Sequence, residues 1–541
     1  MAQMTGAQAL VEALEAEGVD TVFALPGVQI MAAFDAMHGS EKINLIGVRH
    51  EQATTYMADG YARVTGKPGV ALVVPGPGAL NAAAGLLTAY STSSPVLLIS
   101  GQIPSASLGK HEGQLHEISE QLDVFRPITK WNTRVTSVEE VPGAIREAFR
   151  QMTTGRPRPV EVEIPPDVLA GEGDVRIEKP VHDPVQEPSR ADIESAARAL
   201  TRSRRPAIAI GGGALRADAG DTLAEVAEAL QAPIVSTQQA KSVMPNSHPL
   251  YVGVHYAGIG VSGELLGESD VILAVGTRLQ IRDFKLSPDQ TLIQIDVDPE
   301  ELAKDHGASV KINADARAAL RSLAHELAET GAADETREPR AERYRQKYRE
   351  MLKRRAAPQV EWVQAVREAT ARDAVIVSGM TNTGYWSHMA YYVEQGGEYI
   401  SPGYGGTLGY GFPTALGAKV AAGDREVVAL CGDGGFMYAV QELATARRYG
   451  INLATVVFDN GAYGASRWDQ RHRYGDREIG TEFFNPDWET LARAFGVRCF
   501  SADSPEGLEA ALKQALSLKE PVLIAVRQPL MAPPFQLVDG E

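Results

Sequence analysis

Short apolar runs alternate with amphipathic stretches along almost the whole chain, and this alternation constrains the fold more than any other feature. In the first part of the sequence, the apolar runs lie at 21–25, 43–48, 69–74 and 95–100, with helical patterns between them. Parallel neighbouring strands need long crossover connections, which are usually helices. The pattern therefore predicts βαβ units and a parallel sheet in this part of the chain.

The same alternation returns in two later parts of the chain. Its apolar runs lie at 207–213, 232–236, 270–276 and 292–297, and then at 374–379, 426–432, 452–458 and 521–527. A polar, proline-containing stretch at 171–190 predicts a linker. The highly charged stretch 333–355 predicts a solvated helix that leads into the last part. We therefore expect an α/β protein of three successive parallel-sheet domains, at 1–170, 190–330 and 358–541.

The charge balance narrows the classes of partner. The chain has 52 Lys and Arg against 69 Asp and Glu, a net charge of −17, which disfavours binding to nucleic acid or to anionic membranes. No apolar run is long enough to span a bilayer, and the acidic N-terminus lacks the basic region of a signal peptide. Two cysteines are too few for a disulfide framework. We expect a cytoplasmic protein with small-molecule partners.

The sharpest chemical motif lies in the last part of the chain. A predicted strand runs into Gly432-Asp433-Gly434-Gly435, a helix is predicted at 436–448, and the next strand ends at Asp459-Asn460. Parallel strands bring their carboxyl ends to one edge of the sheet. Carboxylate and amide oxygens suit Mg²⁺, and glycines let backbone N–H groups approach a phosphate. The alternative without chemistry is that Asp433 only caps a helix in a tight turn. The spacing of 27 residues between Asp433 and Asn460 favours instead a metal that bridges protein and diphosphate.

This motif resembles that of thiamine diphosphate-dependent enzymes. The resemblance implies that the side chains of Asp433 and Asn460 and the carbonyl of Ala462 bind Mg²⁺. Family members usually end the motif in Asn-Asn, and Asp459 is a departure at the position that does not bind metal. The three parts of the chain look like the pyrimidine-binding, Rossmann-like central and diphosphate-binding domains of the acetolactate synthase-like group.

A second motif, Arg49-His50-Glu51-Gln52, lies where a predicted strand meets a predicted helix. On its own, a glutamate at the start of a helix is only favoured by the helix dipole. The resemblance implies that Glu51 is buried and hydrogen-bonds N1′ of the cofactor's aminopyrimidine. A carboxyl group that shares a proton there helps the cofactor to lose its C2 proton. Glu51 is therefore the first catalytic candidate.

Further cofactor contacts follow from the same resemblance. The glycine-rich stretch 405–413 places the Gly406 carbonyl against the 4′-amino group, and Leu408 wedges the two cofactor rings into a bent shape. Acetolactate synthases generally carry Met at that position, and Leu fills a similar volume. The other expected cofactor contacts are Pro26, Gly27, Gly76, Asn81, Thr381, Asn382, Thr383, Gly432, Gly434, Gly435, Tyr463 and Gly464.

Two residues are expected to face the substrate. Gln29 stands where acetolactate synthases usually carry a small residue. His116 stands where the family often has Gln, and a histidine near the reacting carbon could relay a proton. The alternative is a surface-loop histidine, and the sequence favours the two equally.

In the central part, the run Gly211-Gly212-Gly213 lacks the full register of a dinucleotide fingerprint. Some relatives bind FAD at this place, and others bind ADP or nothing. Because the motif is incomplete, we do not expect FAD to bind here.

The resemblance implies decarboxylation of a 2-oxo acid such as pyruvate, followed by ligation of the enamine to a second carbonyl. The departures at Gln29, His116 and Leu408 leave the substrates open. Alternatives are a lyase or decarboxylase that releases an aldehyde from another 2-oxo acid, a hydroxy ketone or an acyl-CoA, a flavin-linked oxidase, and a non-catalytic scaffold. The resemblance also implies a homodimer with shared active sites, commonly doubled to a homotetramer.

Overall fold

The computed structural model describes residues 2–256, 258–280, 284–304, 307–331, 337–356, 358–394 and 396–536. Residue 1, residues 333–336 of the charged stretch and residues 537–541 of the expected last domain lie outside the described residues. The described residues form three six-stranded sheets in which every neighbouring pair of strands is parallel. This confirms the expected class of three successive parallel-sheet α/β domains.

The first sheet has the strand order β3-β2-β4-β5-β7-β6. Its strands are β2 Thr21–Ala24, β3 Asn44–Gly47, β4 Gly69–Val73, β5 Val96–Gly101, β6 Trp131–Arg134 and β7 Val160–Ile164. Its helices are α1 Gly6–Ala16, α2 Met31–His38, α3 Glu51–Thr65, α4 Pro77–Thr92, α5 Gln121–Phe125, α6 Val141–Thr153 and α7 Pro166–Ala170.

The third sheet has the order β16-β15-β17-β18-β20-β19, the same topology as the first when each set is renumbered from one. Its strands are β15 Val375–Ser378, β16 Glu398–Ile400, β17 Val427–Gly432, β18 Ala454–Asp459, β19 Arg498–Ala502 and β20 Val522–Arg527. Its helices are α15 Gln359–Ala369, α16 Asn382–Ala390, α17 Gly411–Ala422, α18 Asp433–Met437, α19 Leu443–Tyr449, α20 Gly464–Arg473, α21 Trp488–Ala494 and α22 Pro505–Ser517.

The central sheet has the order β11-β10-β9-β12-β13-β14, which is the doubly wound dinucleotide-fold order. Its strands are β9 Pro206–Ile210, β10 Ile234–Thr237, β11 Tyr251–His255, β12 Val271–Val275, β13 Thr291–Asp296 and β14 Val310–Asn313. Its helices are α8 Arg190–Thr201, α9 Gly212–Arg216, α10 Gly220–Leu230, α11 Ser262–Gly267, α12 Pro299–Ala303 and α13 Ala316–Thr330.

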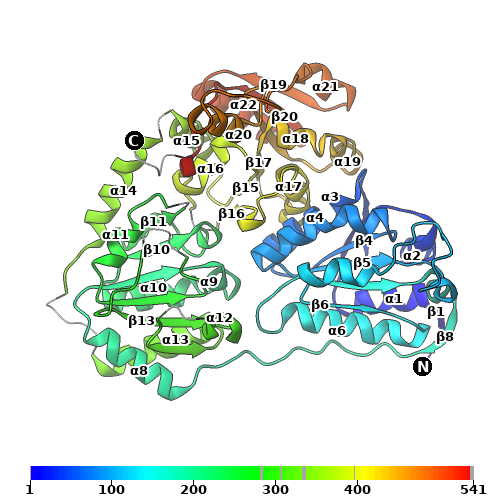
Figure 1. Cartoon of the computed structure of the whole chain (residues 1–541), viewed down its shortest axis with the longest axis horizontal. Coiled ribbons are helices and arrows are strands. Elements are labelled where there is room, and N and C mark those ends of the chain that lie inside the picture. The colour runs from blue at the N-terminus through cyan, green and yellow to red at the C-terminus, as the bar shows by residue number, and fades with distance from the viewer. Residues whose placement is uncertain are drawn as a thin grey trace.

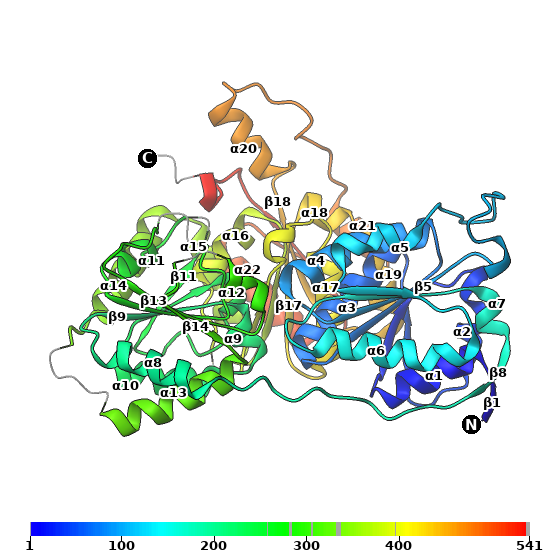
Figure 2. The same ribbon diagram turned by 60° about the horizontal axis from the view of Figure 1, so that its bottom comes forward.

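The first and central domains lie side by side, and the third domain bridges them (Figure 1). Helices α3 and α17 cross at very short range: a Cβ on Gly60 would lie 2.0 Å from the Thr414 carbonyl oxygen, and one on Gly417 would lie 1.9 Å from that of Met57. Residues of both helices belong to one buried apolar cluster. The first and third domains therefore share a core. Helix α20 stands out from the body (Figure 2).

Three local expectations need correction. The expected linker 171–190 begins with a strand, β8 Glu172–Val175, which pairs antiparallel with β1 Ala2–Thr5 and so belongs to the first domain. The expected helix at 436–448 is broken into α18, the 3-10 turn Val440–Glu442 and α19, because the glycine run itself starts α18 and the chain turns after it.

The charged stretch forms a helix, α14 Ala341–Arg355, but it is not solvated all round. Tyr344, Tyr348, Met351 and Leu352 are buried at helical spacing, and the Tyr348 hydroxyl donates a hydrogen bond to the Met389 carbonyl oxygen in the third domain (3.1 Å). The many charged residues mask this apolar stripe in the sequence. Helix α14 therefore ties the central domain to the third one. Within the described ranges, no helix combines the length and apolar character that a membrane crossing requires.

Candidate active site

The residues expected at the site lie at or after the carboxyl ends of strands in the first and third domains. In the first sheet the chain reverses direction across the sheet between β2 and β4, and in the third sheet between β15 and β17. Ligands of open α/β sheets bind outside the strand ends at such switch points. The two sheets thus offer two matching half-sites.

In the first domain, Glu51 is the first residue of α3. Its Oε2 accepts a hydrogen bond from Asn81 Nδ2 (3.0 Å). A Cβ on Gly78 would lie 3.6 Å from Glu51 Oε1 and 2.6 Å from Val74 Cγ2, so a glycine there leaves room beside the carboxylate. Contrary to expectation, Glu51 is only half-buried in a single chain. The carboxylate is held in place but lacks a cover on one side.

The structure brings the segments of Gln29 and His116, the two residues expected to face the substrate, close to each other and to Gly76, an expected cofactor contact. Gln29 is buried and its Nε2 donates to the Leu115 carbonyl oxygen (3.0 Å). A Cβ on Gly76, whose φ is +59°, would lie 2.3 Å from the His116 carbonyl oxygen. Gln29 Oε1 and His116 Nδ1 are buried atoms without a hydrogen-bond partner among the described residues. Both atoms are therefore free to meet a ligand.

In the third domain, Asp433 starts α18 and its carboxylate is nearly surrounded by donors. Oδ1 accepts from the Gly434 N–H (2.9 Å), and Oδ2 accepts from the N–H groups of Gly461 (2.8 Å) and Asn460 (3.2 Å). Burial raises the pKa of Asp433 to about 6. A buried carboxylate gains from a nearby cation, which would favour its charged form.

Asn460 provides the second oxygen of this half-site. Its Oδ1 is buried and has no hydrogen-bond partner within the described part of the chain. Ala462 follows in a short antiparallel bridge with Glu482. The residue whose backbone N–H binds the buried Asp433 carboxylate thus also carries an unpartnered amide oxygen, and this pair of oxygen types suits Mg²⁺. The residues present therefore fit the expected metal.

The glycine run is surrounded by residues from the other predicted motifs. A Cβ on Gly432 would lie 3.1 Å from Thr381 Cβ, one on Gly434 2.8 Å from Tyr463 Cε1, and one on Gly435 3.8 Å from Leu408 Cδ2. A Cβ on Gly464 would meet Asn460 Nδ2 at 2.7 Å and Asn382 Nδ2 at 3.4 Å. A side chain at 432, 434 or 464 would therefore crowd these neighbours, whereas a Cβ at 435 would make only an ordinary van der Waals contact. Gly406 has φ +52° in the turn before Leu408.

Thr383 differs from its neighbours. Its side chain is fully buried, and its hydroxyl donates to Gln528 Oε1 (3.0 Å) at the end of β20. The Thr383 hydroxyl is thus hydrogen-bonded within the domain and does not face the glycine run.

Sequence reasoning missed Asn485. Its Nδ2 donates to Asp433 Oδ2 (2.8 Å) and to Asp459 Oδ1 (2.7 Å). Asp459 Oδ2 also accepts from Trp488 Nε1 (2.7 Å). Asn485 thus bridges the two carboxylates and holds Asp433 in position. Its place in a loop, 25 residues after Asn460, carries no motif that could have revealed it.

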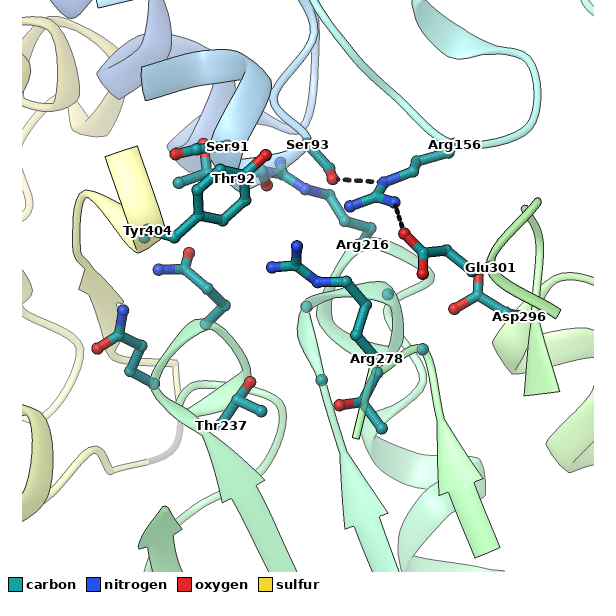
Figure 3. A pocket seen from close by; sticks show the side chains of 18 of the residues that line it. Ser91, Thr92, Ser93, Arg156, Arg216, Thr237, Arg278, Asp296, Glu301 and Tyr404 are labelled. Carbon is teal, nitrogen blue, oxygen red and sulfur yellow. Dashed lines mark hydrogen bonds and ion pairs between the residues drawn. The ribbon is translucent and has the colours of Figure 1, made fainter. Parts of the chain in front are cut away.

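The glycine run at 211–213 lines a cavity of about 980 Å³ to which all three domains contribute (Figure 3). Arg216 and Arg278 of the central domain and Tyr404 of the third domain line it. Arg156 of the first domain donates to Ser93 Oγ (2.9 Å) and to Glu301 Oε1 (2.8 Å). The cavity has room for a ligand of the size of ADP or FAD, so the weak motif does not mark a closed site.

Comparison with known proteins agrees with this geometry. The chain matches the N-terminal TPP binding domain of thiamine pyrophosphate enzymes at 4–124, their central domain at 193–323 and their C-terminal TPP binding domain at 379–526.

Curated relatives align over nearly their full lengths. A probable acetolactate synthase large subunit of Methanocaldococcus jannaschii is 33% identical over 97% of this chain and 92% of its own. A probable 2-ketoarginine decarboxylase of Pseudomonas aeruginosa is 35% identical over 97% and 94%. The acetolactate synthase large subunit of Haemophilus influenzae is 32% identical over 96% and 93%. The three family domains match in the same order along the chain, and the relatives align with nearly its whole length. The chain therefore belongs to the thiamine pyrophosphate enzyme family.

Proposed function

We propose that the protein is an enzyme that uses thiamine diphosphate and Mg²⁺ to decarboxylate a 2-oxo acid and to join the remaining fragment to a second carbonyl compound. The observation that carries the proposal is the pair of half-sites. Asn81 orients the carboxylate of Glu51 in the first half-site, and in the other half-site Asp433 accepts from the N–H of Asn460, whose side-chain oxygen has no partner among the described residues. A non-catalytic scaffold would have no need for both.

The metal would be held by Asp433, Asn460 and the Ala462 carbonyl, with the diphosphate over the glycine run. When bound, thiamine diphosphate supplies a carbon nucleophile and accepts the electron pair that decarboxylation leaves. Glu51 holds a proton at N1′ of the aminopyrimidine, while Asn81 keeps its carboxylate in one orientation. Leu408, beside the glycine run, supplies the apolar wedge between the two ring systems.

Gln29 and His116 would act on the substrate. Gln29 Oε1 and His116 Nδ1 are the buried polar atoms of this region that lack a partner among the described residues, and a buried polar atom gains from one. The imidazole of His116 can donate a hydrogen bond, which suits a carbonyl oxygen that gains charge during the reaction. Gln29 can accept a hydrogen bond from a substrate hydroxyl.

The reaction is tested by incubating the Mg²⁺- and thiamine diphosphate-loaded protein with a panel of 2-oxo acids, each with and without an aldehyde or second 2-oxo acid. We expect carbon dioxide release and a ligated hydroxy-keto product by mass spectrometry. The second candidate is decarboxylation alone, which the 2-ketoarginine decarboxylase relative supports. It predicts the aldehyde as the sole organic product. No carbon dioxide from any 2-oxo acid would contradict both.

We also propose that two chains combine to complete each site. Large apolar side chains next to the expected site residues are exposed in the single chain: Val28 (76%) beside Gln29 and Leu115 (62%) beside His116. In the third domain, Phe484 (94%) is exposed in the segment that follows α20. Exposed apolar surface around both half-sites is typical of a subunit interface. A two-fold dimer would cover the open side of Glu51 with the third domain of its partner, and such dimers are often doubled to tetramers.

Mixing two inactive variants tests the shared site. Glu51→Gln removes the acid from the first domain, and Asp433→Ala removes a metal ligand from the third. If each site takes one half from each chain, a mixed dimer has one site with both defects and one intact site. We expect activity to return on subunit exchange, up to about half the wild-type activity per mixed dimer. Mixed dimers that form, as shown by differently tagged chains, yet stay inactive would contradict the shared site.

A further inference from the structure

Glu442 is a charged residue that the proposed chemistry does not use, although it is fully buried at the end of the turn between α18 and α19. Its carboxylate reaches across to the first domain, 393 residues away in the sequence. Oε1 and Oε2 accept hydrogen bonds from the Arg49 N–H at 3.1 and 3.2 Å. Oε2 also accepts from the Thr445 hydroxyl (2.5 Å). Burying a carboxylate costs free energy unless the carboxylate is hydrogen-bonded. The hydrogen bonds to Arg49 and Thr445 therefore explain why Glu442 can be buried here.

Two further bonds from the third domain hold the same turn of the first domain. The Tyr449 hydroxyl oxygen accepts from the Gly47 N–H (2.8 Å), before the turn. The Tyr438 carbonyl oxygen accepts from Gln52 Nε2 (2.8 Å), after it. The segment 47–52 is therefore held at its start, middle and end. We call these contacts to Gly47, Arg49 and Gln52 the turn clamp.

The clamped turn carries Glu51. Its strand β3 ends at Gly47, and its helix begins with Glu51 itself. The backbone N–H groups before a helix lack partners within the helix, and an acidic side chain is a favourable acceptor for them. Burial raises the pKa of Glu442, whereas its bonds to the Thr445 hydroxyl and to the backbone N–H groups of Arg49 and His50 lower it. The turn and the buried carboxylate thus stabilise each other.

We infer that Glu442 is a positioning residue for Glu51: through the turn clamp, it fixes the backbone from which the Glu51 carboxylate reaches the aminopyrimidine. The inference rests on the proposed function, because it gives Glu51 a position to keep. Misplacing a reacting group by about 1 Å can cost about 10²-fold in rate. Glu442 itself need not touch cofactor or substrate for this effect.

The test compares Glu442→Gln with Thr445→Val. Glutamine keeps the size of the side chain but replaces one of the two accepting oxygens with an N–H₂ donor. Thr445→Val removes the hydroxyl donor to Glu442 and leaves both oxygens free for the Arg49 N–H. Both variants disturb the same buried spot, and only the first disturbs the acceptor that faces the turn. Tyr449→Phe, which removes the bond to Gly47, is a second variant of the clamp in case Glu442→Gln does not fold.

The first readout needs no cofactor. Hydrogen–deuterium exchange of the amides of 47–52, followed by mass spectrometry, should be about tenfold faster in Glu442→Gln than in the wild type or in Thr445→Val. The second readout is the rate at which bound thiamine diphosphate exchanges its C2 proton, measured by NMR after acid quench. We expect this rate to fall about 10- to 100-fold in Glu442→Gln, with cofactor affinity within a few-fold of wild type.

Glu51→Gln, measured in parallel, separates the two proposals. If Glu51→Gln exchanges the C2 proton at the wild-type rate, the proposed role of Glu51 is wrong. If Glu51→Gln is slow while folded Glu442→Gln, or folded Tyr449→Phe in its place, matches the wild type in both readouts, the positioning inference alone is overturned. Equal slowing in Thr445→Val would also overturn it, because the effect would then come from general loosening of the buried spot.

Discussion

Glu51→Gln is expected to lower the rate of decarboxylation by about 10²–10⁴-fold, the range that general acid–base catalysis contributes. Glutamine can still accept the hydrogen bond from Asn81 through its side-chain oxygen, so the geometry of the site is kept. It cannot give up or share a proton at N1′ of the aminopyrimidine. Carbon dioxide release with a 2-oxo acid substrate, measured at saturating thiamine diphosphate and Mg²⁺, provides the rate.

The matched control for this prediction is Glu12→Gln, the same chemical change at an exposed position of α1. We expect this control to keep the wild-type rate and both variants to keep the wild-type melting temperature. A Glu51→Gln enzyme with nearly wild-type turnover would remove Glu51 from the proton transfer. Glu51 is only half-buried in one chain, and we propose that a second chain covers it. Turnover should therefore also fall when the protein is diluted to monomers.

Asp433→Ala is expected to abolish the Mg²⁺ dependence of thiamine diphosphate binding and to weaken that binding by about 10²–10³-fold. A loss of this size is typical when one partner of a buried charge pair is removed. Alanine removes one proposed metal ligand and also leaves the Asn460 N–H without its acceptor, whereas the Gly461 N–H keeps its bond to Asp459 Oδ1 (3.0 Å). Quenching of tryptophan fluorescence, measured with Mg²⁺ and with a chelator, reports the affinity. Trp488 lies close by, because its indole N–H binds Asp459.

Asp503→Ala, an exposed position of the same domain, is the control and should bind the cofactor like the wild type. The prediction fails if the wild-type protein binds thiamine diphosphate equally well with and without chelator. It also fails if Asp433→Ala keeps the wild-type response to Mg²⁺.

The strands that the sequence predicts and those that it misses differ in their place in the sheet. The apolar runs identify mostly inner strands, which are buried on both faces. The missed strands β1, β6, β8, β11, β14, β16 and β19 all lie at sheet edges, and β6 and β14 carry polar side chains. One missed strand, β7, is internal. Its Glu161 and Glu163 are buried and bound by Ser100 and Gln102, partners that a local pattern cannot reveal.

The candidate site divides in the same way. Asp433 and Asn460 directly follow predicted strands, so the sheet topology alone predicts that they approach each other. Asn485 and Glu442 act across long stretches of sequence, and their partners depend on how loops and domains pack. The approach of His116 to Gly76 likewise depends on a backbone contact in a loop, which no spacing rule encodes.

The glycine crossing of α3 and α17 has a consequence for how this protein is made. At roughly 5–20 residues per second, a ribosome completes α17 roughly 20–70 seconds after α3. During that interval, the surface of α3 around Met57 and Gly60 has left the ribosome without the helix that will cover it. The central domain, whose sheet is continuous in sequence, can complete its own core first. Nascent chains stalled before α17 should therefore expose an apolar surface that recruits chaperones, and full-length chains should lose it.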